Sequence, residues 1–175
     1  MSDISNKSGM ITIISGTNRK GSTTRKVAGQ YREILKKKGI NANFVSLEDL
    51  DVSGRNAAIF RLEETILIPT EKFIFISPEY NGSIPGVLKS LIDVSDIRKV
   101  WWHKKALLTG ISNGRAGNLR GMEHLTGILH YVKMIVHPNK LPISVVDTLM
   151  NKKELITDKA TLGAINTQLD EFIRF

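Results

Sequence analysis

The chain of 175 residues contains no cysteine. This absence excludes a disulfide framework, cysteine-ligated zinc or iron–sulfur clusters, and a thiol nucleophile. Long hydrophobic runs are missing too, because stretches such as residues 10–14 are far shorter than the roughly 20 residues of a membrane span. They are also too short for the apolar region of a signal peptide. We therefore expect a soluble cytoplasmic protein that has no membrane partner.

The composition is that of one globular domain. Hydrophobic residues make up 41% and charged residues 24% of the chain, which excludes collagen-like, coiled-coil and disordered proteins. A single domain is the default at this length, and it can bury a core without a disulfide or a metal ion. We expect residues 1–9, which are polar, to form a flexible N-terminus, and residues 10–175 to form the domain.

Basic residues are in excess, with 25 Lys and Arg against 17 Asp and Glu, which gives a net charge of +8. Such an excess is typical of nucleic-acid-binding proteins. However, the lysine clusters at 36–38, 104–105 and 152–153 lie between predicted elements, and no segment combines dense basic residues with aromatics that would stack on bases. We therefore expect no nucleic-acid partner. The charge indicates solvated helix ends and loops, and attraction of phosphate-bearing small ligands.

Short apolar runs alternate with segments that carry apolar residues at helical spacing. The predicted strands are 10–15, 41–47, 72–77, 106–111 and 132–137, and the predicted helices are 22–38, 57–67, 84–94, 118–131 and 158–175. This alternation predicts an α/β fold, a doubly wound five-stranded parallel sheet with helices on both faces. Ligands of such sheets bind at the carboxyl ends of the strands. The loops after the first, third and fourth strands therefore form the candidate site.

The first of these loops, residues 16–25, reads G-T-N-R-K-G-S-T-T-R and leads into a helix. Helix N-termini bind phosphate through free N–H groups and the positive end of the dipole. Hydroxyl side chains add donors: Thr17, Ser22, Thr23 and Thr24. Arg19 can bind a phosphate with two parallel hydrogen bonds. Because Ser22 stands where a P-loop has lysine, a nucleotide hydrolase is not expected; the alternative to a phosphate site is an N-capped helix with a polar turn.

The second and third loops carry features of a site for a flat heterocycle. Residues 77–86, S-P-E-Y-N-G-S-I-P-G, are stiffened by two prolines, so that their backbone groups can follow the edge of a ring, with Tyr80 against its face or rim. Residues 110–118, G-I-S-N-G-R-A-G-N, contain glycines that let the backbone approach a ligand. Arg115 is a candidate contact for a dinucleotide phosphate. The alternatives are a long turn with a surface tyrosine and a glycine-rich helix start with an exposed arginine.

Together the three loops resemble the NADPH-dependent FMN reductase family of flavodoxin-like proteins, which includes quinone, azo-dye and chromate reductases. The family pattern G-S-x-R-x-x-S-x-N corresponds to residues 16–24. The pattern P-E-Y-N-x-S-x-P-G-x-L-K-x-x-I-D matches residues 78–93 at every fixed position, and S-x-G-x-x-G matches residues 112–117. The resemblance extends over nearly the whole chain from Met10.

The resemblance implies FMN as the cofactor, either resident or exchanging as a substrate, and NADPH or NADH as the electron donor. The FMN phosphate would be held by Thr17, Arg19, Ser22 and Thr24, with the hydroxyl of Thr23 beside them. Its ring would be lined by Pro78, Glu79, Tyr80, Asn81 and Gly82, and closed on the other edge by Ser112 and Gly114. Thr24 replaces the usual Asn, and Val94 replaces a common Trp, so the substrate preference is expected to differ from that of better-known members.

The implied activity is an FMN-dependent NAD(P)H oxidoreductase that passes hydride through the flavin to a quinone-like or other small acceptor by ping-pong. No catalytic side chain is expected, because the flavin carries the chemistry, and no metal site, because the histidines lack ligand spacing. The alternatives are a flavodoxin-like electron carrier and a low-turnover FMN-binding module. The family also implies a homodimer or homotetramer formed through the helices at 84–94 and 118–131. Two further expectations are a solvated face for Glu63 and a packing or subunit contact for residues 101–102.

Overall fold

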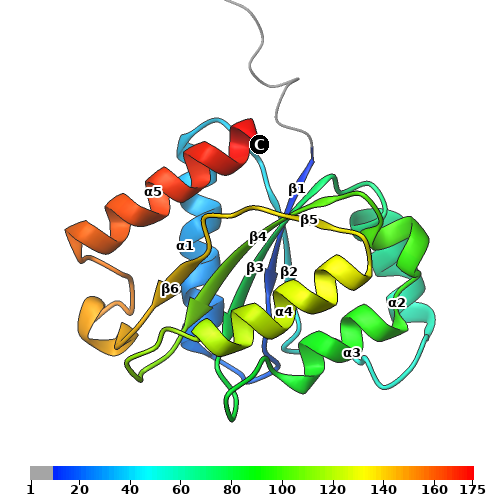
Figure 1. The fold of residues 1–175 in the computed structure, drawn as a ribbon, viewed down its shortest axis with the longest axis horizontal. Coiled ribbons are helices and arrows are strands. Elements are labelled where there is room, and N and C mark those ends of the chain that lie inside the picture. Colours follow the sequence, from blue (N-terminus) through cyan, green and yellow to red (C-terminus); the bar gives the residue numbers. More distant parts are fainter. Residues whose placement is uncertain (1–9) are drawn as a thin grey trace, which may run out of the picture.

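The computed structural model describes residues 10–175, and the expected N-terminal segment 1–9 lies outside the described residues. Its main strands are β1 (Ile11–Ser15), β2 (Asn43–Ser46), β3 (Lys72–Pro78) and β4 (Lys105–Ile111). They pair in parallel in the order β2-β1-β3-β4, and the last position beside β4 is filled by two short strands (Figure 1). This 2-1-3-4-5 order is the flavodoxin-like one. The predicted doubly wound parallel sheet is confirmed.

The fifth strand position differs from the prediction of one strand over residues 132–137. The chain forms β5 (Ile135–Val136) against the start of β4, and then β6 (Leu141–Ile143) against its end. Lys133 has a φ of 58°, which terminates the preceding helix before a strand can begin. Pro138 has no N–H for the ladder, so the chain leaves the sheet there and returns three residues later. The sequence interpretation was therefore too long at its start and missed β6.

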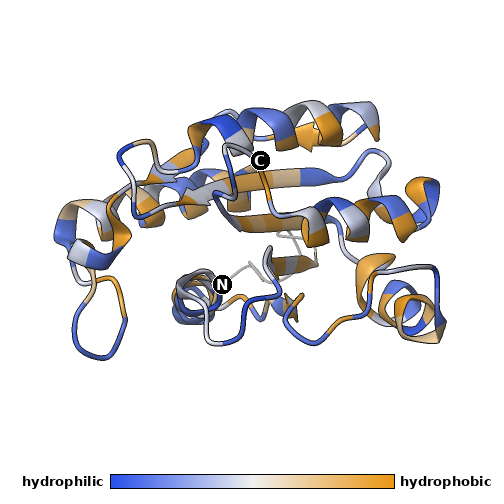
Figure 2. Cartoon of the chain, turned by 90° about the horizontal axis from the view of Figure 1, so that it is seen from below, coloured by the Kyte–Doolittle hydropathy of each residue, from blue (hydrophilic) through white to orange (hydrophobic). Residues whose placement is uncertain are grey.

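Five α-helices flank the sheet within residues 10–175: α1 (Thr23–Lys37), α2 (Ala57–Leu62), α3 (Gly86–Val94), α4 (Leu119–Tyr131) and α5 (Lys159–Arg174). Helix α2 continues as a π-helical turn, Glu63–Leu67. Buried side chains of α1 and α5 pack on one face of the sheet, and those of α2, α3 and α4 pack on the other. In Figure 2 hydrophobic colours dominate the strands, whereas the helices mix both kinds. No helix in this part of the chain has the length and apolar character needed to cross a membrane.

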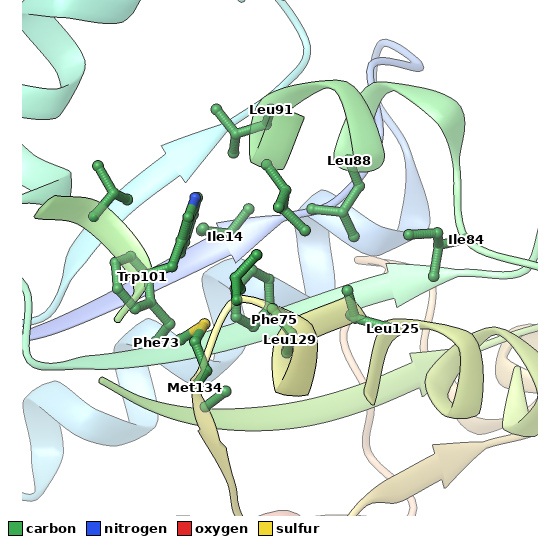
Figure 3. Close-up of a cluster of buried hydrophobic side chains, with 14 of the residues drawn as sticks. Ile14, Phe73, Phe75, Ile84, Leu88, Leu91, Trp101, Leu125, Leu129 and Met134 are labelled. Carbon is green, nitrogen blue, oxygen red and sulfur yellow. The ribbon is translucent and has the colours of Figure 1, made fainter. Parts of the chain in front are cut away.

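Aromatic rings fill the core between the sheet and helices α2, α3 and α4. The centroid of Trp101 lies 5.0 Å from that of Phe73 and 6.2 Å from that of Phe75. Figure 3 shows this cluster, with Leu88 and Leu91 of α3 beside it. Trp101 is fully buried and is a core residue. Its neighbour Trp102 lies outside the core, where the Lys133 ammonium sits 3.9 Å from its ring centroid.

A buried polar network joins the other core layer. The side-chain oxygen of Gln168 on α5 accepts hydrogen bonds from Tyr31 Oη on α1 and Thr109 Oγ1 on β4, at 3.0 and 3.1 Å. Its side-chain nitrogen donates to the carbonyls of Leu108 and Asn139, at 3.0 and 2.9 Å. Burial raises the pKa of Tyr31, so this phenol stays protonated. The network is fully satisfied and ties both helices to the sheet.

Glu63 corrects the expectation of a solvated carboxylate. Its side chain is 1% exposed and accepts hydrogen bonds from the Arg55 guanidinium at 2.7 Å and from the backbone N–H of Asp96 at 2.6 Å. The carboxylate therefore fastens the loop before α2 to the segment after α3. Helical spacing alone placed Glu63 beside solvent, because the loops that cover it come from elsewhere in the sequence.

His137 is expected to make the fold less stable as the pH falls below neutral. Burial lowers the pKa of this imidazole below 6.5, since its ring sits edge-on 4.8 Å from that of Phe175. The unfolded chain therefore takes up the proton first, and the free energy of unfolding decreases as the pH falls from about 6.5 toward the lower folded pKa. Thermal unfolding followed by circular dichroism between pH 8 and 5 measures this loss.

The variant His137→Gln should flatten the pH dependence of the melting temperature over that range. His130 provides the matched control, because it is exposed on α4, and His130→Gln should leave the slope as it is in the wild type. Equal slopes in the wild type and in His137→Gln would contradict the assignment.

Candidate functional site

The three loops singled out by the sequence meet at one cavity. Strands β1, β3 and β4 are parallel neighbours, so their carboxyl ends lie at the same edge of the sheet, where the strand order reverses. The cavity there measures about 560 Å³. The predicted site residues that line it are Thr17, Arg19, Ser22, Thr23, Thr24, Pro78, Glu79, Tyr80, Ser112 and Gly114. Lys20, Ile111, Asn113, Arg115, Ala116 and Val146 complete its wall.

The first loop ends in the N-terminus of helix α1, whose own first turn carries no acidic residue. Ser22 is the N-cap of α1, and its hydroxyl accepts a hydrogen bond from the backbone N–H of Arg25 at 3.2 Å. The first turn of α1 contains no Asp or Glu. The early N–H groups of the helix and the positive end of its dipole are thus available to an anion in the cavity. The hydroxyls of Thr17 and Thr24 sit at the same place, on residues 1% and 3% exposed.

Tyr80 connects the second loop to the first. Its hydroxyl lies 2.6 Å from the hydroxyl of Thr17. The Arg19 guanidinium lies over the tyrosine ring, 4.2 Å from its centroid, a cation–π contact. The tyrosine hydroxyl therefore points to the first loop, and the expected contact of Tyr80 with a ring face or rim stays a prediction. Arg19 and Tyr80, from two different loops, are thus in contact beside the cavity.

The second loop turns sharply at Asn81 and Gly82, and these two predicted site residues do not line the cavity. Tyr80 and Ser83 exchange two backbone hydrogen bonds, at 2.9 and 3.1 Å. The residues between them have φ values of 50° and 78°, as a type I′ turn requires. The Ser83 hydroxyl also lies 2.9 Å from Nδ1 of His124 on α4. The Asn-Gly pair thus shapes the loop that presents Glu79 and Tyr80.

The third loop is fixed by close packing against its neighbours. A Cβ on Gly110 would lie 2.3 Å from the carbonyl oxygen of Gly117, so only glycine fits there. Asn118, with a φ of 63°, donates from its side-chain nitrogen to the carbonyl of Ser77 at the end of β3, at 2.9 Å. The Ser112 hydroxyl donates to the carbonyl of Gly114 at 3.0 Å. These contacts fasten both ends of the third loop, and its exposed residues between them line the cavity.

Sequence reasoning missed Glu48, which follows β2. One carboxylate oxygen accepts a hydrogen bond from the backbone N–H of Gly21 at 2.7 Å, and the other pairs with the Arg25 guanidinium. Its side chain is only 6% exposed. The position of Glu48 in the sequence could have predicted this contact. The carboxyl end of β2 neighbours that of β1, so a side chain just after β2 reaches the first loop.

The donor set fits a flavin mononucleotide. Hydroxyls, a guanidinium and a helix N-terminus gather at one end of the cavity, which suits a phosphate. The lining also includes the apolar side chains of Pro78, Ile111 and Val146, together with residues of the second and third loops, which suits a flat ring with polar edges. The volume lies within the range of small-molecule sites.

A second groove and the acidic and histidine side chains of the described chain do not bring the three motif loops together. A larger groove of about 1050 Å³ runs along α1 past Arg32, Phe44 and Leu162, away from the carboxyl ends of the strands. Within residues 10–175, no three His, Asp or Glu side chains gather where they could hold a metal ion. The cavity at the strand ends is therefore the candidate site.

Comparisons with known proteins identify a family model and relatives that match this chain. Residues 10–146 match the family model described as NADPH-dependent FMN reductase. The chain is 33% identical over 119 residues to an NAD(P)H-dependent FMN reductase of Pseudomonas aeruginosa, a match that covers 65% of this chain and 63% of the relative. It is 32% identical over 132 residues to an NAD(P)H:quinone oxidoreductase of Solanum tuberosum, which covers 67% of this chain and 68% of the relative.

The solved structure of a flavoenzyme NAD(P)H:(acceptor) oxidoreductase from Paracoccus denitrificans superposes on the chain with a TM-score of 0.77. The superposition covers 94% of this chain and 95% of that one at 21% sequence identity. At this identity the likeness shows the fold. The matches to the two sequence relatives span about two thirds of their lengths.

Proposed function

The chain belongs to the NADPH-dependent FMN reductase family, and from this premise we propose that it catalyses the reduction of a quinone-like or other small acceptor by NAD(P)H. NAD(P)H gives up a hydride and becomes NAD(P)⁺; the quinone takes up that hydride and one proton from water and becomes the hydroquinone. FMN, when bound, supplies the hydride chemistry. The observation that carries the proposal is the meeting of all three motif loops at one cavity with a cationic, hydroxyl-rich end.

The first loop is proposed to hold the phosphate of FMN. Arg19 supplies a charge-assisted pair of hydrogen bonds, and Ser22 and Thr23 supply donors at the N-terminus of α1. Thr17 and Thr24 add hydroxyls from buried positions. Thr24 thereby takes the place of the amide side chain that the family pattern carries there. Binding the phosphate in this way orients the rest of the ligand toward the second and third loops.

The second and third loops are proposed to hold the ring. Pro78, Glu79 and Tyr80 of the second loop and Ser112 and Gly114 of the third loop line the cavity. These residues position the ring and exclude water from its edges, and none of them is assigned a proton transfer. Nicotinamide and acceptor are proposed to use the same face of the ring in turn, which corresponds to a ping-pong order.

The visible absorption spectrum tests the proposal. The purified protein is incubated with FMN, desalted, and measured before and after anaerobic addition of NADPH and, separately, NADH. We expect a retained yellow chromophore that bleaches with one of the two nucleotides and regains its colour when a benzoquinone is added. Retained colour that neither nucleotide bleaches would instead favour an electron carrier or a binding module. A protein that neither retains FMN nor oxidises NAD(P)H in its presence would refute the proposal.

We also propose that the protein assembles as a homodimer or homotetramer through α3 and α4. A groove of about 620 Å³ between these helices is lined by apolar side chains, among them Ile92, Ile97 and Ile128. Tyr131 at its rim is 84% exposed, which is unusual for an aromatic residue beside an apolar groove. Sedimentation equilibrium distinguishes the monomer mass of 19.5 kDa from its multiples.

A further inference from the structure

Glu48 places a buried negative charge beside a site proposed to bind a phosphate. Its side chain is 6% exposed, and one oxygen lies 2.7 Å from the backbone nitrogen of Gly21. Gly21 directly precedes Ser22, the N-cap of α1. The neighbouring carboxylate, Asp49, is by contrast 80% exposed and lies 3.9 Å from Lys20. Of these two acidic side chains, only Glu48 is built into the loop.

The carboxylate changes what the first loop offers to an anion. It occupies the N–H of Gly21, which has a φ of 63° and would otherwise be a further donor of the loop. It also engages the guanidinium of Arg25 in the first turn of α1, so that this cation is turned toward Glu48. The pair reduces the positive charge at the helix N-terminus by one unit. A like charge near a ligand weakens the binding of that ligand, the more so where burial limits screening by salt.

We propose that Glu48 is a specificity-determining residue that lowers the affinity of the site for the phosphate of FMN, and so narrows the preference for FMN over a flavin without a phosphate. This inference rests on the proposed function, because it concerns the same site. In this proposal the negative charge of Glu48 repels the phosphate, and its acceptor oxygen holds the loop through a hydrogen bond. These two effects separate in a variant that keeps the acceptor and removes the charge.

Glu48→Gln is that variant, since its amide oxygen can still accept from Gly21 while Arg25 is released. The dissociation constants of FMN and riboflavin, which lacks the phosphate, are measured by quenching of flavin fluorescence at fixed ionic strength. We expect the affinity for FMN to rise about 5- to 10-fold and that for riboflavin to stay within about twofold. The rate of FMN release, measured by stopped flow, should fall by the same factor as the dissociation constant.

Two further variants control the measurement. Glu48→Asp keeps the charge and should keep the wild-type preference between FMN and riboflavin. Asp49→Asn removes an exposed charge from the same segment and should change the affinity for FMN less than twofold. Where Glu48→Gln does not fold, Arg25→Gln tests the same idea with the opposite sign, because it leaves the Glu48 charge unpaired. FMN affinity should then fall while riboflavin affinity is retained.

The outcomes are decisive in both directions. An unchanged ratio of FMN to riboflavin affinity in Glu48→Gln overturns the inference, and so does an equal loss for both flavins, which would make Glu48 a brace of the loop only. A wild-type protein that binds neither flavin refutes the proposed function itself. Wild-type binding of FMN with an unaltered ratio in the variant refutes the role of Glu48 alone.

Discussion

Arg19→Ala is expected to lower the affinity for FMN about 10- to 100-fold, the effect of losing hydrogen bonds to a charged group. Its guanidinium is positioned over the Tyr80 ring, 4.2 Å from the centroid, at the end of the cavity where α1 begins. A phosphate bound there contacts a planar guanidinium, which loses little side-chain entropy for each hydrogen bond that it forms. Fluorescence titration with FMN at constant ionic strength measures the change.

The control ligand and control variants decide what the loss means. Riboflavin affinity should change by less than about threefold in Arg19→Ala, since the missing contact is to the phosphate. Arg19→Lys should recover only part of the FMN affinity, because an ammonium cannot form two parallel hydrogen bonds. Arg115→Ala removes a cation from the third loop, which also lines the cavity but is not part of the proposed phosphate contacts, and should alter FMN affinity little. Equal losses for FMN and riboflavin would show that Arg19 only packs against Tyr80.

Arg19 is expected to raise the affinity for the phosphate of FMN, and Glu48 to lower it. If both act through charge, removal of Glu48's charge should partly offset the loss in Arg19→Ala, and the double variant should bind FMN more tightly than Arg19→Ala alone. The site then has an affinity set by a balance of charges rather than by the largest possible number of cations. Such a balance is consistent with a chain of net charge +8 that nonetheless buries a carboxylate beside its anion-binding loop.

The sheet and the position of the site could be predicted because both depend on local patterns. Residues 72–77 and 106–111 are buried on both faces, so each reads as a mostly apolar run without alternation. The reversal of strand order then places the loops after β1, β3 and β4 together without any knowledge of contacts. Chain direction and apolar periodicity therefore determine which loops meet.

Contacts between distant segments could not be predicted in this way. Glu63 is buried by Arg55 and by the backbone of Asp96, 33 residues away. Tyr80 points at Thr17 through a hydrogen bond across 63 residues. The split fifth strand depends on the geometry at Pro138 and on the space that β4 leaves beside its end. In each case the position of the side chain or strand depends on a partner elsewhere in the sequence, which local propensity cannot identify.

Gln168→Leu is expected to lower the free energy of unfolding by about 2–3 kcal/mol, the cost of leaving buried polar groups unpaired. The substitution keeps the side-chain volume nearly constant, so that little of the effect comes from a cavity. It removes the acceptor of Tyr31 and Thr109, whose hydroxyl oxygens lie 2.9 Å apart, so that only one of them can then donate to the other. It also removes the donor to the carbonyls of Leu108 and Asn139. Urea unfolding followed by circular dichroism measures the change, and the melting temperature should fall by roughly 5–10 °C.

Thr167→Leu is the matched control, because Thr167 is the neighbouring residue on α5 and is exposed. It introduces the same side chain at a surface position and should change stability by less than about 0.5 kcal/mol. Tyr31→Phe should cost less than Gln168→Leu, since Gln168 and Thr109 still satisfy each other at 3.1 Å. A loss below about 1 kcal/mol in Gln168→Leu would mean that apolar packing replaces the network. If Gln168→Leu costs the most stability of these variants, Gln168 is the residue that links α1, β4 and α5, because it takes part in four hydrogen bonds of the network.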